Sequence, residues 1–551
     1  AWGGRSYPVE YTYDSQGRSK TLTTWQSFNF GTGQGTSGAA TTTWTYSPTR
    51  GWLTTKGYQG QAGPTYDYWP SGRMKSRSWA RGITTNYTYT TGGELHQINY
   101  SDTTPDVTHT YNRRGQVVAV TDGVGDRTLA YSDPGAMIDE DFTSGVLDPV
   151  HIQNTYDSLL RRDHNKLQVN SIQVNDVSYG YDAASSRLAS VGKDSNHRAE
   201  YAYTPGDDSL ASTTFKVSNV TKATVTRTFD KLGRLTQIQS DSVTAPDEGF
   251  TYTYDAANQR TRVDLVDGTY WLYQYDSLGQ VIGGKRYIDL PPAGPDGDIL
   301  TPGEQFEYTF DHIGNRTQTK VGGNSAGQSL RTATYNRNLL NQYTSRTVPG
   351  TVDLLGFAPA NNPVTFATPP GGNPVAADFR SGEFYQKALS WTNTLIARYE
   401  GVDIDTNGGG APEETRWVFL PKTPENFTHD LDGNLLSDGK WLYTWDGENR
   451  LVAMETKSSL PVAMPAVRLE FVYDYMSRRC VKRVYDHSAQ GGTPSSGEPT
   501  VEGSAFARGR RHHHASGLDA GQHVQVRVGR LAPHRRAGRP ERGGPDMRVG
   551  P

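Results

Sequence analysis

The residues whose spacing is most specific for chemistry are Asp403, Asp405, Asn407, Gly408 and Glu414. They match the ligand and glycine positions of an EF-hand calcium loop, which binds the ion through carboxylate and amide oxygens. The flanking segments LIARYEGV and TRWVFL favour strands, whereas an EF-hand requires helices. We therefore predict a polar hairpin loop, and calcium binding at millimolar concentration remains the alternative.

Two other groups could bind a metal. Asp430, Asp432 and Asn434 superficially resemble a second calcium loop, but Gly433 occupies the wrong position for one. The histidines at 512–514 could bind a transition metal, an affinity that we expect to be incidental. P-loop, GxSxG, HExxH and CxxC motifs do not occur. We predict no catalytic, cofactor-binding or metal-binding residue and no cofactor, so the chain is not expected to be an enzyme.

Cys480 is the only cysteine, so no internal disulfide is possible. Basic neighbours could lower its pKa, but no histidine is placed by motif to pair with it, and we predict a structural thiol. A single thiol suits either the cytosol or export. The sequence begins at Ala1 with no visible signal peptide, so we expect a piece of a longer protein or a processed form.

The composition indicates which elements position these residues. Of 551 residues, 34% are hydrophobic and 11% aromatic, with 32 Tyr against 16 Phe. Tyr and Trp bury large areas while keeping a polar tip, and they suit half-exposed sheets. The net charge of −3 gives no global attraction to nucleic acid, and no apolar run could span a membrane. The composition predicts an all-β protein with no nucleic-acid partner and no transmembrane segment.

An aromatic residue followed by Asp recurs along the chain, with steps of 21 to 25 residues between several copies. Such a step suits one β-hairpin. The copies are Tyr13-Asp14, Tyr66-Asp67, Tyr156-Asp157, Tyr181-Asp182, Phe229-Asp230, Tyr254-Asp255, Tyr275-Asp276, Phe310-Asp311, Trp445-Asp446, Tyr473-Asp474 and Tyr485-Asp486, with degenerate copies at Tyr111-Asn112, Tyr335-Asn336 and His429-Asp430.

The residues after each aromatic-Asp pair predict a tight turn. In Asp276-Ser277-Leu278-Gly279 the carboxylate can accept from backbone N–H groups, and the glycine can adopt a positive φ. Asn258 and Asn449 replace the glycine in two copies. Alternating strands on both sides complete a hairpin signal. We interpret the repeated Asp as a turn former and the repeated Tyr as a packing residue, in preference to a catalytic pair or a sugar-stacking platform.

The phrases YDSLGQVIGG, FDKLGRLTQI, YDAANQRTRV and WDGENRLVAM resemble the YD repeat of Rhs (rearrangement hot spot) proteins, toxin-complex C-components and teneurins. The resemblance implies a β-ribbon that spirals into a large hollow shell, which encloses a C-terminal cargo in the toxin-related proteins. Asp133-Pro134 and Asp148-Pro149 are similar to Asp-Pro dipeptides of the autoprotease that follows such shells. They lie too early in the chain for that role.

The resemblance implies a non-enzymatic, secreted or cell-surface shell segment that encloses or presents a C-terminal polypeptide or a surface region. The alternative is an extracellular adhesion or glycan-binding module that uses the aromatic hairpins. The partner would then be an encapsulated polypeptide or a surface protein or glycan.

Departures from the repeat predict the domain organisation. We expect a YD-repeat shell at 1–350, an inserted β module at 351–427, a continuation of the shell at 428–487 and a disordered Gly/Arg/Pro-rich tail at 488–551. The tail lacks the further repeats and the core that the resemblance would place there. We therefore expect a fragment of a longer protein, or a frame-shifted end.

Overall fold

The computed structural model describes residues 7–194, 196–245, 247–289, 298–486 and 500–503. These residues form strands, turns and one short 3-10 helix, η1 (Gly145–Leu147), so the predicted all-β fold is confirmed. The chain divides into two compact units. The described residues of unit 1 lie within 7–350, 391–400 and 417–503, and those of unit 2 are Thr351–Ser390 and Gly401–Arg416. The predicted tail and its histidines at 512–514 lie outside the described residues.

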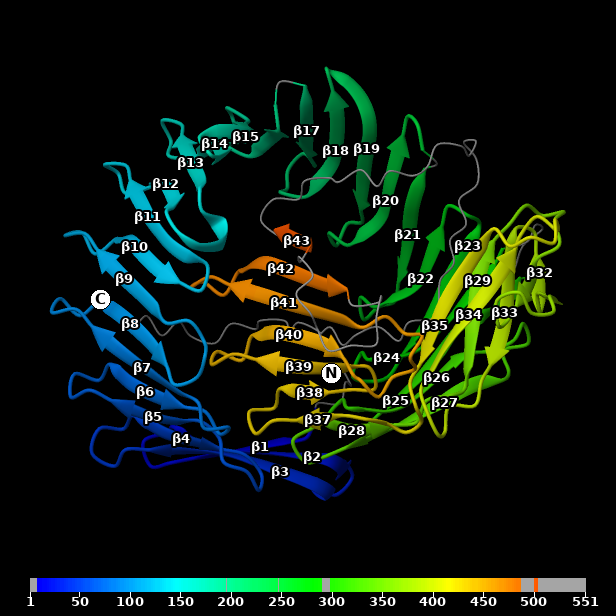
Figure 1. Cartoon of the computed structure of the whole chain (residues 1–551), viewed down its shortest axis with the longest axis horizontal. Coiled ribbons are helices and arrows are strands. Elements are labelled where there is room, and N and C mark those ends of the chain that lie inside the picture. The colour runs from blue at the N-terminus through cyan, green and yellow to red at the C-terminus, as the bar shows by residue number, and fades with distance from the viewer. Residues whose placement is uncertain (1–6, 195, 246, 290–297, 487–499, 504–551) are drawn as a thin grey trace. The chain divides into compact units, whose positions relative to one another are not determined.

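Unit 1 is built on a 29-stranded antiparallel sheet that we call the ribbon. Each of its first 27 strands pairs with the next one in the chain, and the last pairing joins β28 to β36 (Figure 1). A second, seven-stranded sheet, the return sheet, follows in the same order from β37 to β43. The hairpin repeat is therefore the unit of both sheets.

The strands of the ribbon are β1 (Val9–Tyr13), β2 (Ser19–Asn29), β3 (Gln34–Tyr46), β4 (Leu53–Gly57), β5 (Thr65–Tyr68), β6 (Met74–Ser78), β7 (Thr84–Tyr89), β8 (Leu95–Tyr100), β9 (Val107–Tyr111), β10 (Val117–Asp122), β11 (Gly125–Tyr131), β12 (Met137–Phe142), β13 (Val150–Tyr156), β14 (Arg162–Val169), β15 (Ile172–Tyr181), β16 (Leu188–Gly192), β17 (His197–Tyr203), β18 (Leu210–Val217), β19 (Val220–Phe229), β20 (Leu235–Ser242), β21 (Glu248–Tyr254), β22 (Arg260–Leu265), β23 (Thr269–Tyr275), β24 (Val281–Ile288), β25 (Ile299–Phe310), β26 (Arg316–Gly322), β27 (Leu330–Arg337), β28 (Tyr343–Arg346) and β36 (Glu425–Asn426). Those of the return sheet are β37 (Thr428–His429), β38 (Leu435–Ser437), β39 (Trp441–Trp445), β40 (Leu451–Thr456), β41 (Val467–Tyr473), β42 (Arg479–Asp486) and β43 (Thr500–Gly503).

Two small sheets occupy the segment between β28 and β36: β29 (Thr351–Phe357), β32 (Phe379–Ser381) and β33 (Phe384–Ser390) form one, and β30 (Thr365–Ala367), β31 (Val375–Ala376), β34 (Arg398–Asp405) and β35 (Glu414–Leu420) form the other. Leu354, Phe366 and Tyr385 are completely buried, and the rings of Phe366 and Tyr385 meet edge to face at 5.7 Å. The described part of unit 2 therefore has an apolar core of its own.

The predicted turn is confirmed in atomic detail. Asp276 Oδ1 accepts from the backbone N–H groups of Leu278 and Gln280, both at 2.9 Å, and Gly279 has a φ of 78°. Asn258 and Asn449 adopt positive φ in the equivalent place, as predicted. The sequence analysis missed one partner, the residue that follows the glycine. The Gln280 side chain donates to Asp276 Oδ2 at 2.7 Å, and Arg18, Arg234 and Arg450 do the same in their own turns.

Three predicted copies of the turn were wrong. Asp67 lies within β5 and the turn begins at Trp69, while Asn336 lies within β27 and the turn begins at Asn338. Tyr485-Asp486 lies within β42. Alternating strands place an aromatic residue at every second position, so an aromatic-Asp pair also arises inside a strand, where hydrogen bonds to the neighbouring strand leave no room for a turn.

The repeated tyrosines join each hairpin to the one before it. The Tyr254 hydroxyl donates to the carbonyl of Leu235, the first residue after the preceding turn, at 2.6 Å. The Arg234 guanidinium of that preceding turn lies 4.9 Å from the Tyr254 ring centre. Equivalent hydroxyl bonds are made by Tyr46, Tyr89, Tyr111, Tyr131, Tyr156, Tyr181, Tyr203, Tyr275 and Tyr473. The repeated Tyr is a packing residue, as predicted, with a directional bond added.

We predict that Asp446→Ala destabilises its turn by about 2–3 kcal/mol, because two backbone N–H groups and the Arg450 guanidinium lose their acceptor. Hydrogen–deuterium exchange at residues 446–450 and the urea midpoint should both report the loss. Asp133→Ala is the matched control, since Asp133 is an exposed turn residue whose side chain makes no bond to another described residue. Equal exchange in the two variants would contradict this role for the carboxylate.

We expect Tyr254→Phe to cost about 0.5–1.5 kcal/mol, because the ring stays in place and only the hydroxyl bond to Leu235 is lost. Tyr13→Phe serves as its control. Tyr13 is 58% exposed, and its hydroxyl bonds to no other described residue. Chemical denaturation of both variants tests the difference, and an equal effect of the two substitutions would argue against the proposed inter-hairpin bond.

Candidate functional site

Early hairpins of unit 1 meet later turns of the same unit along a line of contacts that we call the seam. Its early side consists of residues 26–28, 77–81, 104 and 122–124, and its late side of residues 311–341, 430–432, 446–448 and 473–475. The Phe28 N–H donates to His312 Nδ1, 284 positions away. Where the late partner follows the segment 351–427, the two residues are farther apart in the sequence. The Thr104–Gly447 bond joins residues 343 positions apart, and the Asp122–Tyr475 bond joins residues 353 positions apart. With the 77 residues of that segment subtracted, these spans are 266 and 276 positions, similar to the 284 of the first bond.

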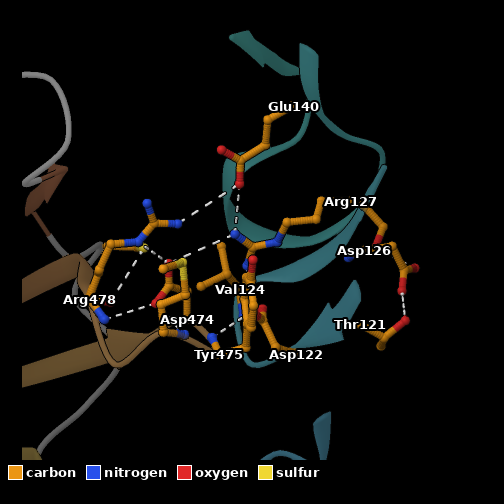
Figure 2. Close-up of polar contacts among 12 residues, drawn as sticks. Thr121, Asp122, Val124, Asp126, Arg127, Glu140, Asp474, Tyr475 and Arg478 are labelled. Carbon is orange, nitrogen blue, oxygen red and sulfur yellow. Dashed lines mark hydrogen bonds and ion pairs between the residues drawn. The ribbon is translucent and has the colours of Figure 1, made fainter. Parts of the chain in front are cut away.

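The most buried part of the seam is an ion cluster around Arg127, which is 1% exposed (Figure 2). The guanidinium of Arg127 pairs with Asp122, with Glu140 at 3.0 Å and with Asp474 at 3.8 Å. Arg478 binds the same Asp474 at 2.6 Å. The early side thus supplies Arg127, Asp122 and Glu140, while the late side supplies Asp474 and Arg478.

Backbone groups complete this cluster. Asp122 Oδ2 accepts from the Tyr475 N–H at 2.8 Å, and Asp122 Oδ1 accepts from the Val124 N–H at 2.8 Å. Asp474 Oδ1 meanwhile accepts from the N–H groups of its own turn, as the other turn-forming Asp residues do. Asp474, which forms a turn of the return sheet, therefore also serves as a counter-ion for the buried Arg127. Buried charges are tolerated only when paired in this way.

Apolar side chains surround the cluster and bury it. Val124 and Phe142 from the early side pack with Cys480 and Val481 from the late side. The Arg127 guanidinium lies 4.8 Å from the Phe142 ring centre, an additional cation–π contact. Burial raises the pKa of the Cys480 thiol to about 11, with a smaller contribution from Asp474. This environment agrees with the structural thiol that the sequence predicts.

A second polar group lies at Trp79 and Arg81, in the turn between β6 and β7. The Trp79 indole N–H donates to the Gly447 carbonyl at 2.7 Å, and Arg81 Nε lies 2.8 Å from Asp432 Oδ2. Burial, together with the neighbouring Asp430 carboxylate, raises the pKa of Asp432, while Arg81 opposes that shift. Asp430 and Asp432 are thus held by a turn and by the seam, which explains their spacing without a metal.

The predicted calcium loop forms the polar connection between β34 and β35, both of which are strands as predicted. Asp405 Oδ1 accepts from the N–H groups of Asn407 and Gly408, and Asp405 Oδ2 accepts from Gly410 at 2.8 Å. Asp403 Oδ2 accepts from the Gly371 N–H at 2.8 Å. The carboxylates thus bind the backbone. Within the described ranges, no three His, Cys, Asp or Glu side chains are grouped so that they could hold a metal ion.

Sequence reasoning did not single out Asp122, Arg127 or Glu140, the three cluster residues that lie outside the repeat. Arg127 and Glu140 are diagonal neighbours on the adjacent strands β11 and β12: Arg127 is opposite Phe142, and Glu140, two residues away, is opposite Leu129. Both side chains are buried. An arginine and a glutamate at inward positions of adjacent strands were the available signal. Asp133-Pro134 forms part of an ordinary repeat turn that begins at Ser132, and Asp148-Pro149 follows η1.

We predict that Arg127→Met destabilises unit 1 by about 3–5 kcal/mol, because three carboxylates lose their buried counter-ion. Urea denaturation followed by tryptophan fluorescence measures the change. Arg113→Met is the control, because Arg113 is exposed and makes no side-chain bond with any other described residue. A loss below about 1 kcal/mol would show that the cluster does not hold the seam together.

Comparisons with known proteins identify the repeat. Residues 205–343 match the family model described as Teneurin YD-shell. The crystal structure of TcdB2-TccC3-Cdc42 is similar at 14% identity and a TM-score of 0.36, over 87% of this chain and 23% of that one. The Photorhabdus luminescens Tc holotoxin pore, with a mutated TccC3, is similar at 13% identity and a TM-score of 0.37, over 86% of this chain and 25% of that one.

The chain spans about a quarter of the length of these solved structures, and similarity at this level carries no argument about the fold. A search of the curated proteins gave no match. In the part of the chain that the structure describes, no helix has the length and apolar character needed to cross a membrane. The family match and the hairpin geometry together confirm the predicted resemblance to YD-repeat shell proteins, and the match to the Teneurin YD-shell model covers residues 205–343.

Proposed function

We propose that this chain is a non-enzymatic segment of a secreted or cell-surface YD shell, and that it encloses or presents a polypeptide. The seam is the observation that carries this proposal. A long sheet whose later turns bond repeatedly to hairpins that lie hundreds of positions earlier has the connectivity of a spiral wall. Polar bonds and buried ion pairs along that line would close the wall against water and proteases.

The state of the repeated side chains supports a structural role. The repeated carboxylates accept backbone N–H groups and neighbouring side chains in one equivalent arrangement after another. A catalytic carboxylate requires a distinctive environment that shifts its pKa. The repeated tyrosine hydroxyls donate to backbone carbonyls, so these rings are committed to packing. Both features favour a wall over an enzyme or an adhesive surface built from the repeated tyrosines.

Limited proteolysis of the full-length protein from its native source tests the proposal. We expect an enclosed polypeptide to survive protease treatment in the wild-type protein and to be degraded in Arg127→Met, because that substitution loosens the seam. Peptides released over time are identified by mass spectrometry. Arg113→Met should protect the polypeptide as the wild type does. Equal digestion of every polypeptide in wild type and Arg127→Met would exclude enclosure.

A further inference from the structure

The loop between β34 and β35, in unit 2, contains an adjacent pair of residues whose chemistry the proposed function does not use. Asn407 precedes Gly408, and no other asparagine among the 551 residues precedes a glycine. Both residues are exposed. The side-chain amide of an asparagine can be attacked by the backbone nitrogen of the next residue, and a glycine leaves that nitrogen unshielded because it has no side chain. The pair is therefore a candidate site of covalent modification.

The conformation of the loop requires a glycine at position 408. Gly408 has a φ of 74°, in the region that glycine adopts most readily. A Cβ atom at this position would also lie 2.5 Å from Pro363 Cγ. The fold therefore keeps an unshielded backbone nitrogen directly after Asn407.

A carboxylate contacts the proton that this nitrogen must lose before it can react. The Gly408 N–H donates to Asp405 Oδ1 at 2.8 Å, and the Gly410 N–H donates to Asp405 Oδ2 at 2.8 Å. Burial acts to raise the pKa of Asp405, but the backbone N–H groups that it accepts, led by that of Gly410, outweigh burial and lower the pKa. Asp405 is therefore ionised at neutral pH and lies within reach of the Gly408 proton, as a general base must.

A donor also contacts the group that would be attacked. Asn407 Oδ1 accepts the N–H of Gly409. Because Gly409 lies two residues on, this bond holds the Asn407 amide alongside the peptide group that contains the Gly408 nitrogen. A donor at the amide oxygen draws electron density away from Cγ, and it stabilises the negative charge that the oxygen gains when Cγ is attacked.

We propose that this loop promotes deamidation of Asn407, with Asp405 as the general base and the Gly409 N–H as the donor to the oxyanion. The Gly408 nitrogen forms a bond to Asn407 Cγ while its proton passes to Asp405. The Cγ–Nδ2 bond then breaks, and the leaving nitrogen takes the proton back from Asp405 and departs as ammonia. Water opens the resulting cyclic imide at either carbonyl, which gives aspartate or isoaspartate. The net reaction consumes one water and needs no oxidant or reductant.

The reaction changes the loop permanently. A neutral side chain becomes a carboxylate, so each molecule gains one negative charge next to Asp405. The isoaspartate product also lengthens the backbone by one atom between β34 and β35. The inference concerns unit 2 alone and is independent of whether the shell encloses a polypeptide.

Mass spectrometry of the full chain during incubation at neutral pH and physiological temperature tests the proposal. After proteolysis, the loop peptide should gain the mass difference between a hydroxyl and an amino group, and part of the product should be isoaspartate. Asn324 is an internal reference, because its Oδ1 also accepts an N–H two residues on, that of Ala326 at 3.0 Å. Ser325 follows it, and no carboxylate among the described residues accepts the Ser325 N–H. We expect Asn407 to convert faster than Asn324.

Two variants of the same loop separate the role of the base from a general effect of charge. Asp405→Asn should slow the conversion of Asn407 by about ten-fold or more, because the base is lost. Glu413→Gln is the matched control, since Glu413 accepts the Thr406 N–H at 2.6 Å and does not contact Gly408. It should convert as the wild type does. Hydrogen–deuterium exchange in β34 and β35 shows whether the hairpin still forms in each variant.

The pH dependence of the wild-type protein gives a second measurement that needs no variant. Asp405 stays ionised below neutral pH, so the rate should fall less than the hydroxide concentration does. The proposal is overturned if Asn407 stays unmodified, if it converts no faster than Asn324, or if the rate is proportional to hydroxide. An equal or faster conversion in Asp405→Asn would also overturn it, because the carboxylate would then only restrain the loop.

Discussion

A single carboxylate that accepts two backbone N–H groups in a five-residue turn is the interaction on which the rest of this protein depends. In turns such as those at Asp14, Asp230 and Asp446, one carboxylate oxygen holds the turn, and the other oxygen holds the arginine that follows the glycine or asparagine. That arginine lies over the tyrosine of the next hairpin. The turn therefore fixes its own geometry and the position of its neighbour.

This arrangement explains how a chain with few aliphatic residues remains ordered. Most strand residues of the ribbon are only partly buried, and fully buried apolar clusters occur where early and late hairpins meet. Directional bonds between hairpins, each worth about 1 kcal/mol, therefore carry a larger share of the stability than in a protein with a thick core. The seam adds apolar burial and paired charges where the ribbon meets itself.

The sequence predicted the elements well and their long-range contacts poorly. Period-two alternation and the Asp and Gly turn residues predicted the hairpins, including the positive φ at Asn258 and Asn449. Local patterns of this kind depend only on neighbouring residues. The roles of Arg127, Glu140 and Trp79 depend on partners hundreds of positions away, and nothing in a single sequence states which hairpins will meet. The turns predicted at Asp67 and Asn336 were wrong because an aromatic residue followed by Asp or Asn occurs both inside strands and at the start of turns.

The pairing of β28 with β36 has a consequence for how such proteins change over evolution. Ser345 and Arg346 pair with Asn426 and Glu425, so the polypeptide leaves the ribbon and rejoins it at an adjacent strand. The ion pair between Arg346 and Glu425, at 2.5 Å, fastens this junction. A module placed there leaves the order and spacing of all other hairpins unchanged. Hairpin junctions of this type are therefore natural points for acquiring new domains, because additional sequence can be accepted there without altering the pairing of the ribbon.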